Sequence, residues 1–280
     1  MPVISRANHD QHTIKLLDKI IFIVDSSKVK KIILLTGAAG GIGLFLANYL
    51  ASEGFSILAL DKHAKISDQP MIDNPNINWI IQDLVSISSS TEASQIFYES
   101  VEAILQGNSL YAIIHNAAVQ CLGGFLELGL NDWRSSLDVN LLAPVAINKL
   151  FMRDLMDSHG CIIHISSIHS HLTKPGFTAY ATSKAALSGL TRAMAVELGD
   201  RVRVNAIEPA AIRTPMLEAG FKDYPELLPR LEEHHPTKSI GSAEDVARAV
   251  SFLLDPANSF INGCVLELGG GIHARLHDPA

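Results

Sequence analysis

Short apolar runs alternate with longer helical patterns along the whole of this 280-residue chain. Seven runs are apolar almost throughout, as strands covered on both faces should be; they span residues 32–35, 56–60, 78–82, 112–115, 161–165, 202–207 and 265–268. A helical period marks residues 43–53, 89–106, 131–157, 179–198 and 243–254. Strand followed by helix, repeated, requires right-handed crossovers and therefore a parallel sheet. We predict an α/β fold with a doubly wound, seven-stranded parallel sheet and helices on both faces.

No linker of biased composition divides this pattern, so we predict one domain over residues 28–280, preceded by an N-terminal extension, residues 1–27. The extension contains an apolar patch, residues 20–24, whose pattern does not decide between strand and helix. A second irregular stretch, residues 215–238, contains three further prolines after Pro215. Long insertions beside a site are usually lids or substrate loops, so we interpret residues 215–238 as a substrate lid.

The composition excludes several classes of protein. Hydrophobic residues make up 48% of the chain and charged residues only 18%, which excludes a disordered chain. A formal net charge of −7 disfavours a nucleic-acid partner, because a phosphate backbone attracts basic surfaces. The N-terminus lacks the apolar region of a signal peptide, and the uncharged residues 32–47 are too short and too rich in glycine for a membrane span.

The cysteines and histidines bear on the compartment and on metal binding. The three cysteines are scattered, which fits a reducing compartment, and no group of side chains has the spacing of a metal site. We therefore expect a cytoplasmic protein with no membrane partner, no nucleic-acid partner and no metal.

A glycine-rich turn follows the first strand and opens a helix. Gly37, Gly41 and Gly43 would let the backbone turn tightly and approach a pyrophosphate, while the helix N-terminus offers free N–H groups. The spacing Gly37-x-x-x-Gly41-x-Gly43 differs from the usual GxGxxG of dinucleotide-binding folds. On this motif alone, a tight turn without a ligand stays an alternative.

Two acidic residues follow the second and third strands. Asp61 lies twenty-four residues after Gly37, where a carboxylate can accept both ribose hydroxyls of an adenosine, which favours NAD over NADP. Asp83, followed by Leu84, could accept from the adenine amine. A helix cap or a surface turn is the alternative for each carboxylate. Lys62 could swing toward a 2′-phosphate, so we expect a preference for NAD rather than exclusion of NADP.

Tyr180 and Lys184 are four residues apart in a helical segment and therefore share one face. Such a pair is common and usually structural, but a lysine beside a tyrosine favours the phenolate and would lower the pKa of Tyr180. A phenol tuned in this way exchanges protons near neutral pH. Small residues on the same helix, among them Ala185 and Gly189, would allow close packing against another helix, which suggests a subunit interface and a homo-oligomer.

Two serines and an asparagine are further candidates. Ser166 and Ser167 end the strand at residues 161–165, and open α/β sheets bind ligands outside the carboxyl ends of their strands. The residues themselves leave both serines open. Asn140 lies in the helical pattern of residues 131–157, four residues before Pro144. Because proline has no N–H, the helix should kink there and free the Asn140 carbonyl, which could hold a water in a proton relay.

Taken in order, these motifs resemble those of the short-chain dehydrogenase/reductase family, in its soluble branch. The resemblance runs from about residue 31 to residue 271. It rests on Thr36-Gly37…Gly41-Ile42-Gly43, His115-Asn116-Ala117-Ala118, Leu137-Asp138-Val139-Asn140, Tyr180-x-x-x-Lys184 and Asn205-Ala206-Ile207-Glu208-Pro209-Ala210, followed by Ile212 and Thr214. The chain departs from the family at His115, Ala118 and Ala210, where the family prefers Asn, Gly and Gly.

The resemblance implies a Rossmann-type fold, a nicotinamide cofactor and a tetramer. It also implies that Tyr180 is the general acid/base, that Lys184 lowers its pKa and binds the nicotinamide ribose, and that Asn140 holds the relay water. Ser167 lies thirteen residues before Tyr180, which is the family spacing, so the resemblance selects it over Ser166. The implied cofactor contacts, counting the carboxylates above, are Gly37, Gly41, Ile42, Gly43, Asp61, Asp83, Leu84, Asn116, Ala117, Tyr180, Lys184, Pro209, Ile212 and Thr214.

The function that we expect is hydride transfer between NAD(H) and a small-molecule substrate, a neutral secondary alcohol or ketone. The expected pocket wall, with Val119, His169, His171 and Phe177, is uncharged and partly apolar. One alternative is an NADPH-dependent 3-oxoacyl-type reductase, although the acidic residues 215–238 would repel an acidic carrier protein. The other is a catalytically silent NAD-binding regulator on the same fold, against which the complete Ser-Tyr-Lys set argues.

Overall fold

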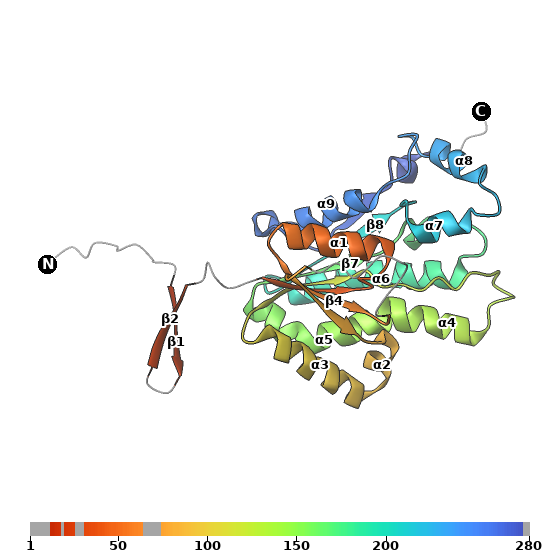
Figure 1. The fold of residues 1–280 in the computed structure, drawn as a ribbon. Coiled ribbons are helices and arrows are strands. Elements are labelled where there is room, and N and C mark those ends of the chain that lie inside the picture. Colours follow the sequence, from red (N-terminus) through yellow and green to blue (C-terminus); the bar gives the residue numbers. More distant parts are fainter. Residues whose placement is uncertain (1–11, 18–19, 26–30, 64–73, 277–280) are drawn as a thin grey trace.

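The computed structural model describes residues 12–17, 20–25, 31–63 and 74–276. Seven strands form one sheet in the order β5-β4-β3-β6-β7-β8-β9, and every neighbouring pair is parallel (Figure 1). The strands are β3 (Ile32–Thr36), β4 (Ser56–Asp61), β5 (Ile77–Ile81), β6 (Leu110–His115), β7 (Cys161–Ile165), β8 (Arg203–Pro209) and β9 (Val265–Leu268). This confirms the predicted fold class.

Helices cover both faces of the sheet. They are α1 (Gly41–Ser52), α2 (Leu84–Ser89), α3 (Thr91–Leu105), α4 (Leu130–Leu137), α5 (Ala143–Asp157), α6 (Thr178–Leu198), α7 (Pro215–Gly220), α8 (Leu227–His234) and α9 (Ala243–Leu254). Side chains alternate across a strand, so Ile33 and Leu35 of β3 pack with α1 and α9, whereas Ile32 and Leu34 pack with α3, α5 and α6.

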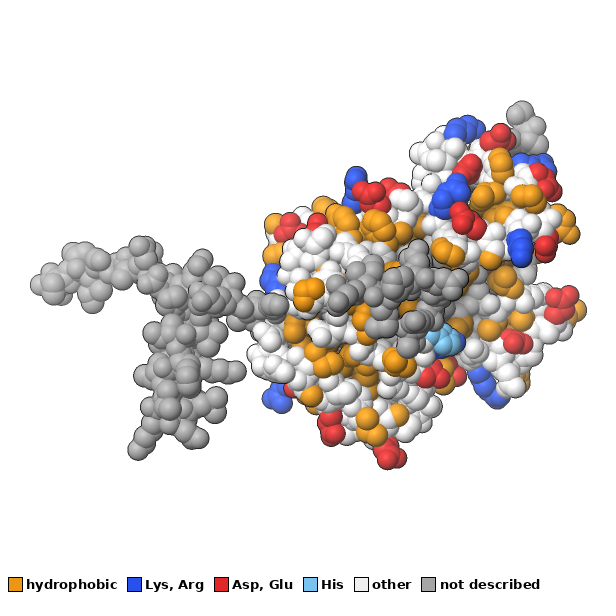
Figure 2. Space-filling model, in the orientation of Figure 1, with side chains coloured by type: hydrophobic (Ala, Val, Ile, Leu, Met, Phe, Trp, Pro, Cys, Tyr) orange, Lys and Arg blue, Asp and Glu red, His pale blue; other side chains and the backbone are white. Residues whose placement is uncertain are grey.

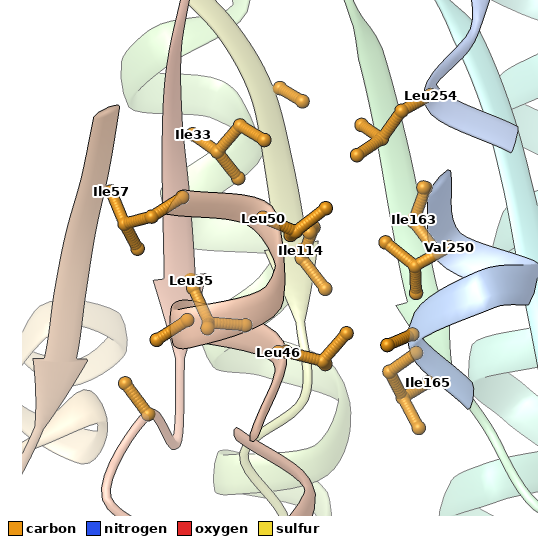
Figure 3. Packing of buried hydrophobic residues seen from close by; sticks show 14 of the residues in the cluster. Ile33, Leu35, Leu46, Leu50, Ile57, Ile114, Ile163, Ile165, Val250 and Leu254 are labelled. Carbon is orange, nitrogen blue, oxygen red and sulfur yellow. The ribbon is translucent and has the colours of Figure 1, made fainter. Parts of the chain in front are cut away.

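The cluster beneath α1 and α9 is shown in Figure 3. Leu46 and Leu50 from α1 and Val250 from α9 lie among isoleucines of β3, β4, β6 and β7, and all of these side chains are fully buried. Each such side chain contributes about 1.5–3 kcal/mol when it leaves water. The continuous apolar strands that the sequence shows are therefore explained by burial on both faces.

The chain reverses direction across the sheet after β5, so that the strands on the two sides of β3 are built in opposite directions. It passes from β3 to β4 and β5 on one side, then crosses to β6 on the other side of β3. The connections that leave the carboxyl ends of β3 and β6 thus diverge, which opens a crevice at this edge of the sheet. In a doubly wound fold this is where a ligand binds.

The prediction of one helix over residues 131–157 is wrong, because this segment is not a continuous α-helix. It consists of α4, a π-helical turn over Asp138–Leu142, and α5. Pro144 lies in the first turn of α5 and lacks the N–H that a regular α-helix would need there, so the chain takes a wider turn before it. The helix predicted over residues 89–106 starts instead at Thr91, with Ser90 as its N-cap, and the short α2 precedes it.

The two irregular stretches both contain regular structure. Residues 215–238 include α7 and α8. In the N-terminal extension, β1 (His12–Leu17) and β2 (Ile20–Asp25) form an antiparallel hairpin, so the apolar patch at residues 20–24 is a strand. The rest of the extension, residues 1–11, 18–19 and 26–27, lies outside the described residues, as do residues 28–30 and 277–280 of the predicted domain.

The surface carries both signs of charge. On the face shown in Figure 2, Lys and Arg side chains are interspersed with acidic ones rather than gathered in one basic patch. Within the described part of the chain, no helix combines the length and the apolar character that crossing a bilayer requires.

Candidate active site

The glycine-rich turn between β3 and α1 leaves no room for side chains. Gly37 has a φ of 65°, in the left-handed region, and a Cβ there would lie 2.7 Å from the Cα of Ala117. A Cβ on Gly43 would lie 2.0 Å from the carbonyl oxygen of Gly37. Glycine is therefore required at both positions, and the backbone itself forms the surface of the turn.

The ends of β3 and β6 are tied together across the crevice. The Thr36 hydroxyl oxygen accepts the backbone N–H groups of Asn116 and Ala117, each at 3.1 Å. The Asn116 amide donates to the carbonyls of Thr36 at 3.2 Å and Gly37 at 2.9 Å. Four hydrogen bonds thus fix the position of the glycine turn relative to β6 before any ligand arrives.

The N-terminus of α1 lies at this turn. The residue before the helix, Gly40, has no side chain to cap it, so the first amides of α1 remain available. Together with the positive end of the helix dipole, they suit a diphosphate. Ile42 lies in this first turn.

The two predicted adenosine carboxylates already accept backbone hydrogen bonds. Asp61 ends β4, and its two oxygens accept the N–H groups of Ala39 and His63, each at 3.1 Å. Asp83 is the N-cap of α2 and accepts the N–H of Val85 at 3.1 Å, so the helix-cap interpretation describes it correctly. An ionised carboxylate has about four lone-pair sites, so both retain capacity for a ligand.

Tyr180 and Lys184 occupy one face of α6, and both are buried. The Lys184 ammonium donates to the carbonyl of Ile165 at 2.7 Å, and its Nζ lies 5.8 Å from the centroid of the Tyr180 ring. Burial lowers the pKa of the Lys184 amine to about 7. A lysine in this condition can gain and lose a proton near neutral pH.

The pKa of Tyr180 differs from the sequence-based expectation. The pKa is raised by burial, which outweighs the lowering effect of hydrogen bonds with the side chains of Ser167 and Gln120. The expectation that Lys184 would lower this pKa was wrong for the structure described here. The amine is directed at the Ile165 carbonyl rather than at the phenol oxygen, and its own charge is weakened by burial.

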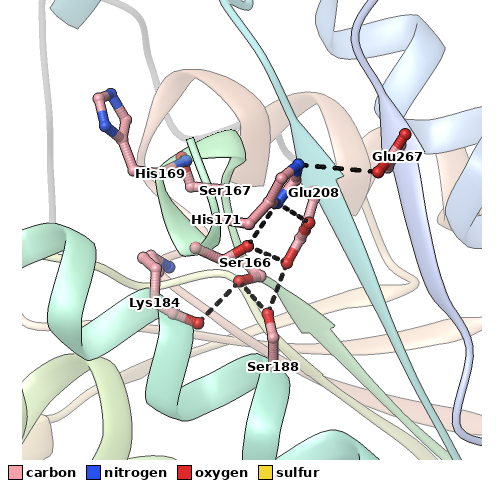
Figure 4. A network of polar contacts seen from close by, with 9 residues as sticks. Ser166, Ser167, His169, His171, Lys184, Ser188, Glu208 and Glu267 are labelled. Carbon is pink, nitrogen blue, oxygen red and sulfur yellow. Dashed lines mark hydrogen bonds and ion pairs between the residues drawn. The ribbon is translucent and has the colours of Figure 1, made fainter. Parts of the chain in front are cut away.

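The two neighbouring serines have different partners. Ser167 hydrogen-bonds Tyr180, and its Oγ also accepts the N–H of His169 at 3.2 Å. Ser166 points away from it, donating to the Lys184 carbonyl at 3.1 Å, with its Oγ 2.7 Å from the Oγ of Ser188 (Figure 4). Only Ser167 therefore shares a site with the phenol.

Asn140 lies in the π-helical turn, and both polar atoms of its side-chain amide form hydrogen bonds. Its Oδ1 accepts the N–H of Val119 at 2.8 Å, while its Nδ2 donates to the Val119 carbonyl at 3.0 Å and to Ser183 Oγ at 2.9 Å. Ser183 is next to Lys184 on α6, so these bonds hold the π-turn against the helix of the candidate site. Such π-turns occur frequently at functional sites.

An aromatic wall stands beside Tyr180. The rings of His169 and Phe177 stack 4.2 Å apart, and both meet the Tyr180 ring edge to face, at 5.8 Å and 6.2 Å. Burial, followed by the charge of Lys174, lowers the pKa of His169 to about 4, so this imidazole is neutral at pH 7. The sequence pattern did not single out Gln120, because only the fold brings it to Tyr180.

The segment after β8 returns to the glycine turn. Pro209 ends β8, Ile212 is buried, and Thr214 is the N-cap of α7. A Cβ on Gly41 would lie 3.2 Å from the Cβ of Thr214, so the start of α7 packs against the start of α1. The fold thus places the predicted site residues near the carboxyl ends of β3 to β8.

A family model described as enoyl-(acyl carrier protein) reductase matches residues 37–273, which is most of the chain. The chain belongs to the short-chain dehydrogenase/reductase family. Among curated relatives, carbonyl reductase [NADPH] 2 of Sus scrofa is 29% identical over 242 residues, covering 85% of this chain and 94% of that protein.

Solved structures of short-chain dehydrogenases agree. The ligand-free aldohexose dehydrogenase of Thermoplasma acidophilum has a TM-score of 0.80 at 26% identity, covering 91% of this chain and 98% of that one. A 4-hydroxyisoleucine dehydrogenase complexed with NADH has a TM-score of 0.78 at 28% identity, covering 88% and 100%. As a short-chain dehydrogenase/reductase, the protein is an NAD(P)-dependent oxidoreductase of alcohols and carbonyl compounds.

The residues of this short-chain dehydrogenase/reductase fit a nicotinamide dinucleotide. The uncapped start of α1 would receive the diphosphate. Because backbone atoms occupy the space that a Cβ on Gly37 or Gly43 would need, the turn presents main chain rather than side chains to a ligand. Asp61 would reach the adenosine ribose from the end of β4, and Lys184 would reach the nicotinamide ribose from α6.

Proposed function

We propose that this enzyme transfers hydride between NAD(H) and a neutral secondary alcohol or ketone by a Ser-Tyr-Lys mechanism assisted by Asn140. The observation that carries the proposal is the buried Tyr180, hydrogen-bonded to Ser167, with Lys184 one turn away on the same helix. These groups lie on α6 and at the carboxyl end of β7, beyond the sheet edge where the glycine turn would hold the cofactor.

When bound, the nicotinamide supplies the hydride acceptor or donor. In the reducing direction, Tyr180 gives its hydroxyl proton to the substrate oxygen, and Ser167 donates a hydrogen bond to that oxygen as negative charge develops on it. Lys184, whose pKa burial lowers to about 7, returns a proton toward Tyr180. The Asn140 side chain holds the π-turn to α6 through Ser183. Its backbone carbonyl would hold the relay water.

Asp61 supports NAD over NADP in this proposal. A 2′-phosphate would bring about two negative charges toward this carboxylate, whereas a 2′-hydroxyl can donate to it. The names of the relatives include both an NADPH enzyme and an NADH complex, so the preference rests on Asp61 itself.

A neutral substrate is favoured by the aromatic wall. His169 is uncharged at pH 7 and stacks on Phe177 beside the phenol, so the two rings offer flat apolar surface there. The nearby Lys174 ammonium lies over the Phe177 ring, 4.8 Å from its centroid. A carbonyl reductase and an aldohexose dehydrogenase among the similar proteins act on uncharged carbonyl compounds or sugars by name.

The description of the family model favours a second candidate, an NADPH-dependent acyl-carrier reductase. The two functions are separated by one assay. Purified enzyme is given either neutral ketones or acyl thioesters, with NADH or NADPH, and cofactor absorbance is followed. Turnover of ketones with NADH supports our proposal; turnover confined to thioesters with NADPH supports the alternative; cofactor binding without any turnover would indicate the silent regulator.

We also propose a homotetramer. The outer face of α6 exposes Ala185 and Val196, the latter at 85%, and a Cβ on Gly189 would meet open space. Apart from the exposed Arg192, this face consists of small or apolar residues, which suits close packing against the same helix of a second copy.

A further inference from the structure

Glu208 is a buried carboxylate in β8, only 3% exposed. A buried charge is costly unless it is paired and hydrogen-bonded, so its partners must offset the loss of water. It directly follows the apolar residues Ala206 and Ile207 at the end of β8, and a charge there is the signal in the sequence that could have drawn attention to it.

The carboxylate of Glu208 joins two other elements (Figure 4). Its Oε1 accepts the hydroxyl of Ser170 and, at 2.7 Å, the hydroxyl of Ser188. Its Oε2 lies 3.0 Å from His171 Nδ1. Ser170 and His171 belong to the loop that starts at Ser167, whereas Ser188 belongs to α6.

The contacts continue from Ser188 toward the candidate site. Ser188 lies one turn beyond Lys184 on α6, and Ser166 contacts both, through the Ser188 hydroxyl and the Lys184 carbonyl. Glu208 therefore reaches the two parts of the structure whose separation decides how Ser167 meets Tyr180: the loop and the helix.

The outer side of His171 faces a second carboxylate and a second imidazole. Its Nε2 lies 3.7 Å from Glu267 Oε1 on β9, and its ring stacks 5.3 Å from His273. The Glu267 side chain is 54% exposed, and its contact with His171 is a long one. The two carboxylates on His171 thus differ sharply: one is buried and reaches three side chains, and the other is in solvent.

We propose that Glu208 is a positioning residue, whose carboxylate holds the Ser167 loop against α6 so that Ser167 and Tyr180 bind one substrate oxygen together. The inference rests on the proposed function for the identity of these reacting groups. Only an ionised carboxylate accepts from Ser170, Ser188 and His171 at once, since an amide of the same shape has one oxygen and turns an NH₂ group toward donors. A displacement of about 1 Å in such a site costs roughly 10²-fold in rate.

The test compares Glu208→Gln with Glu267→Gln, which removes the solvent-exposed carboxylate from the same histidine. For each variant, kcat, both KM values, the urea unfolding midpoint and amide hydrogen exchange are measured. We expect Glu208→Gln to lower kcat by roughly 10- to 100-fold, with the KM for NADH within about twofold of wild type. The amides of residues 170–172 should exchange faster while those of α6 do not change. Glu267→Gln should match wild type throughout.

Other results would overturn the inference. An unchanged kcat in Glu208→Gln shows that the loop does not need the carboxylate. A uniform rise in exchange across α6 and the sheet shows a general loss of stability. If Glu208→Gln does not fold, Ser170→Ala removes one bond on the loop side alone, and an unchanged kcat there has the same meaning.

The exchange measurement also separates this inference from the proposed function. If the wild-type enzyme turns over no alcohol or ketone, the proposed function fails. Faster exchange at residues 170–172 in Glu208→Gln would then still show that the carboxylate holds the loop, whereas unchanged exchange would reject the positioning role as well.

Discussion

Tyr180 is surrounded by groups that donate and accept in a fixed geometry: Ser167 and Gln120 at its hydroxyl, and two stacked rings at its side. In the proposed mechanism, the buried phenol would exchange its proton with the substrate oxygen or with the relay behind Lys184. A burial that raises the pKa of this phenol also keeps it protonated, which is the form needed for reducing a carbonyl.

Replacing Tyr180 by Phe should abolish turnover while leaving the cofactor bound. The hydroxyl supplies the proton, but the ring keeps its contacts with His169 and Phe177. We expect kcat to fall by roughly 10²- to 10⁴-fold, with NADH binding by fluorescence titration nearly unchanged. Tyr49→Phe, in the last turn of α1, is the control. If Tyr180→Phe retains more than a small fraction of the wild-type rate, another group is the acid.

Replacing Asp61 by Ala should weaken the preference for NAD. The measurement is the ratio of kcat/KM values with NAD and with NADP, in the wild type and the variant. We expect the ratio to move toward NADP by roughly tenfold, which corresponds to about 1.4 kcal/mol. Asp200→Ala, which removes an exposed carboxylate after α6, is the control. A wild-type preference for NADP, or a ratio unaffected by the substitution, would show that Asp61 does not contact the ribose.

At the scale of elements, β6 and β7 carry a pair of histidines into the core. His115 and His164 are aligned neighbours in the sheet, and their rings lie 5.3 Å apart. Each is bonded to a neighbouring helix, His115 to Asn148 of α5 and His164 to Thr191 of α6. Burial lowers the pKa of His115 to about 4 and lowers that of His164 well below its usual value.

This pair should make the fold sensitive to acid. Between pH 6.5 and about 4 the unfolded chain binds protons that the folded histidines do not, so stability is complete above pH 6.5 and is lost as the pH falls. His115 alone accounts for about 3 kcal/mol below pH 4. Urea midpoints at pH 7 and pH 4.5 measure the loss. His115→Asn, which cannot bind a proton, should lose less on acidification; an equal loss would contradict this account.

The sequence predicted the elements better than the contacts between them. Runs such as residues 161–165 are apolar because both faces of their strands are buried, so they were recognisable without a structure. Pro144 predicted an irregular helix, although not the π-turn that forms. The Tyr180–Lys184 spacing correctly indicated a shared face, but the direction of the pKa shift depends on burial, which spacing does not encode. The contacts of Gln120 and Glu208 join segments that are distant in the sequence, so local patterns did not predict their partners.

At the scale of the whole molecule, we expect four copies in solution. Sedimentation velocity at micromolar concentration should give a tetramer, and Val196→Arg on the exposed face of α6 should reduce it to a smaller species, because the added charge would be buried between subunits. Phe125→Arg, before α4, places the same charge on another exposed apolar site as a control. A monomeric wild type would contradict the tetramer.

The position of β3 in the sheet has a consequence for the order of events during synthesis. β3 is central, with β4 on one side and β6 on the other, and β6 ends only at His115. Until the ribosome has delivered β6, one hydrogen-bonding edge of this strand, which is apolar up to Thr36, stays open. Such an edge pairs readily with other nascent chains, and distant strand pairing is slow. The risk of aggregation through this edge is therefore confined to the interval in which the chain has emerged past residue 36 but not past residue 115.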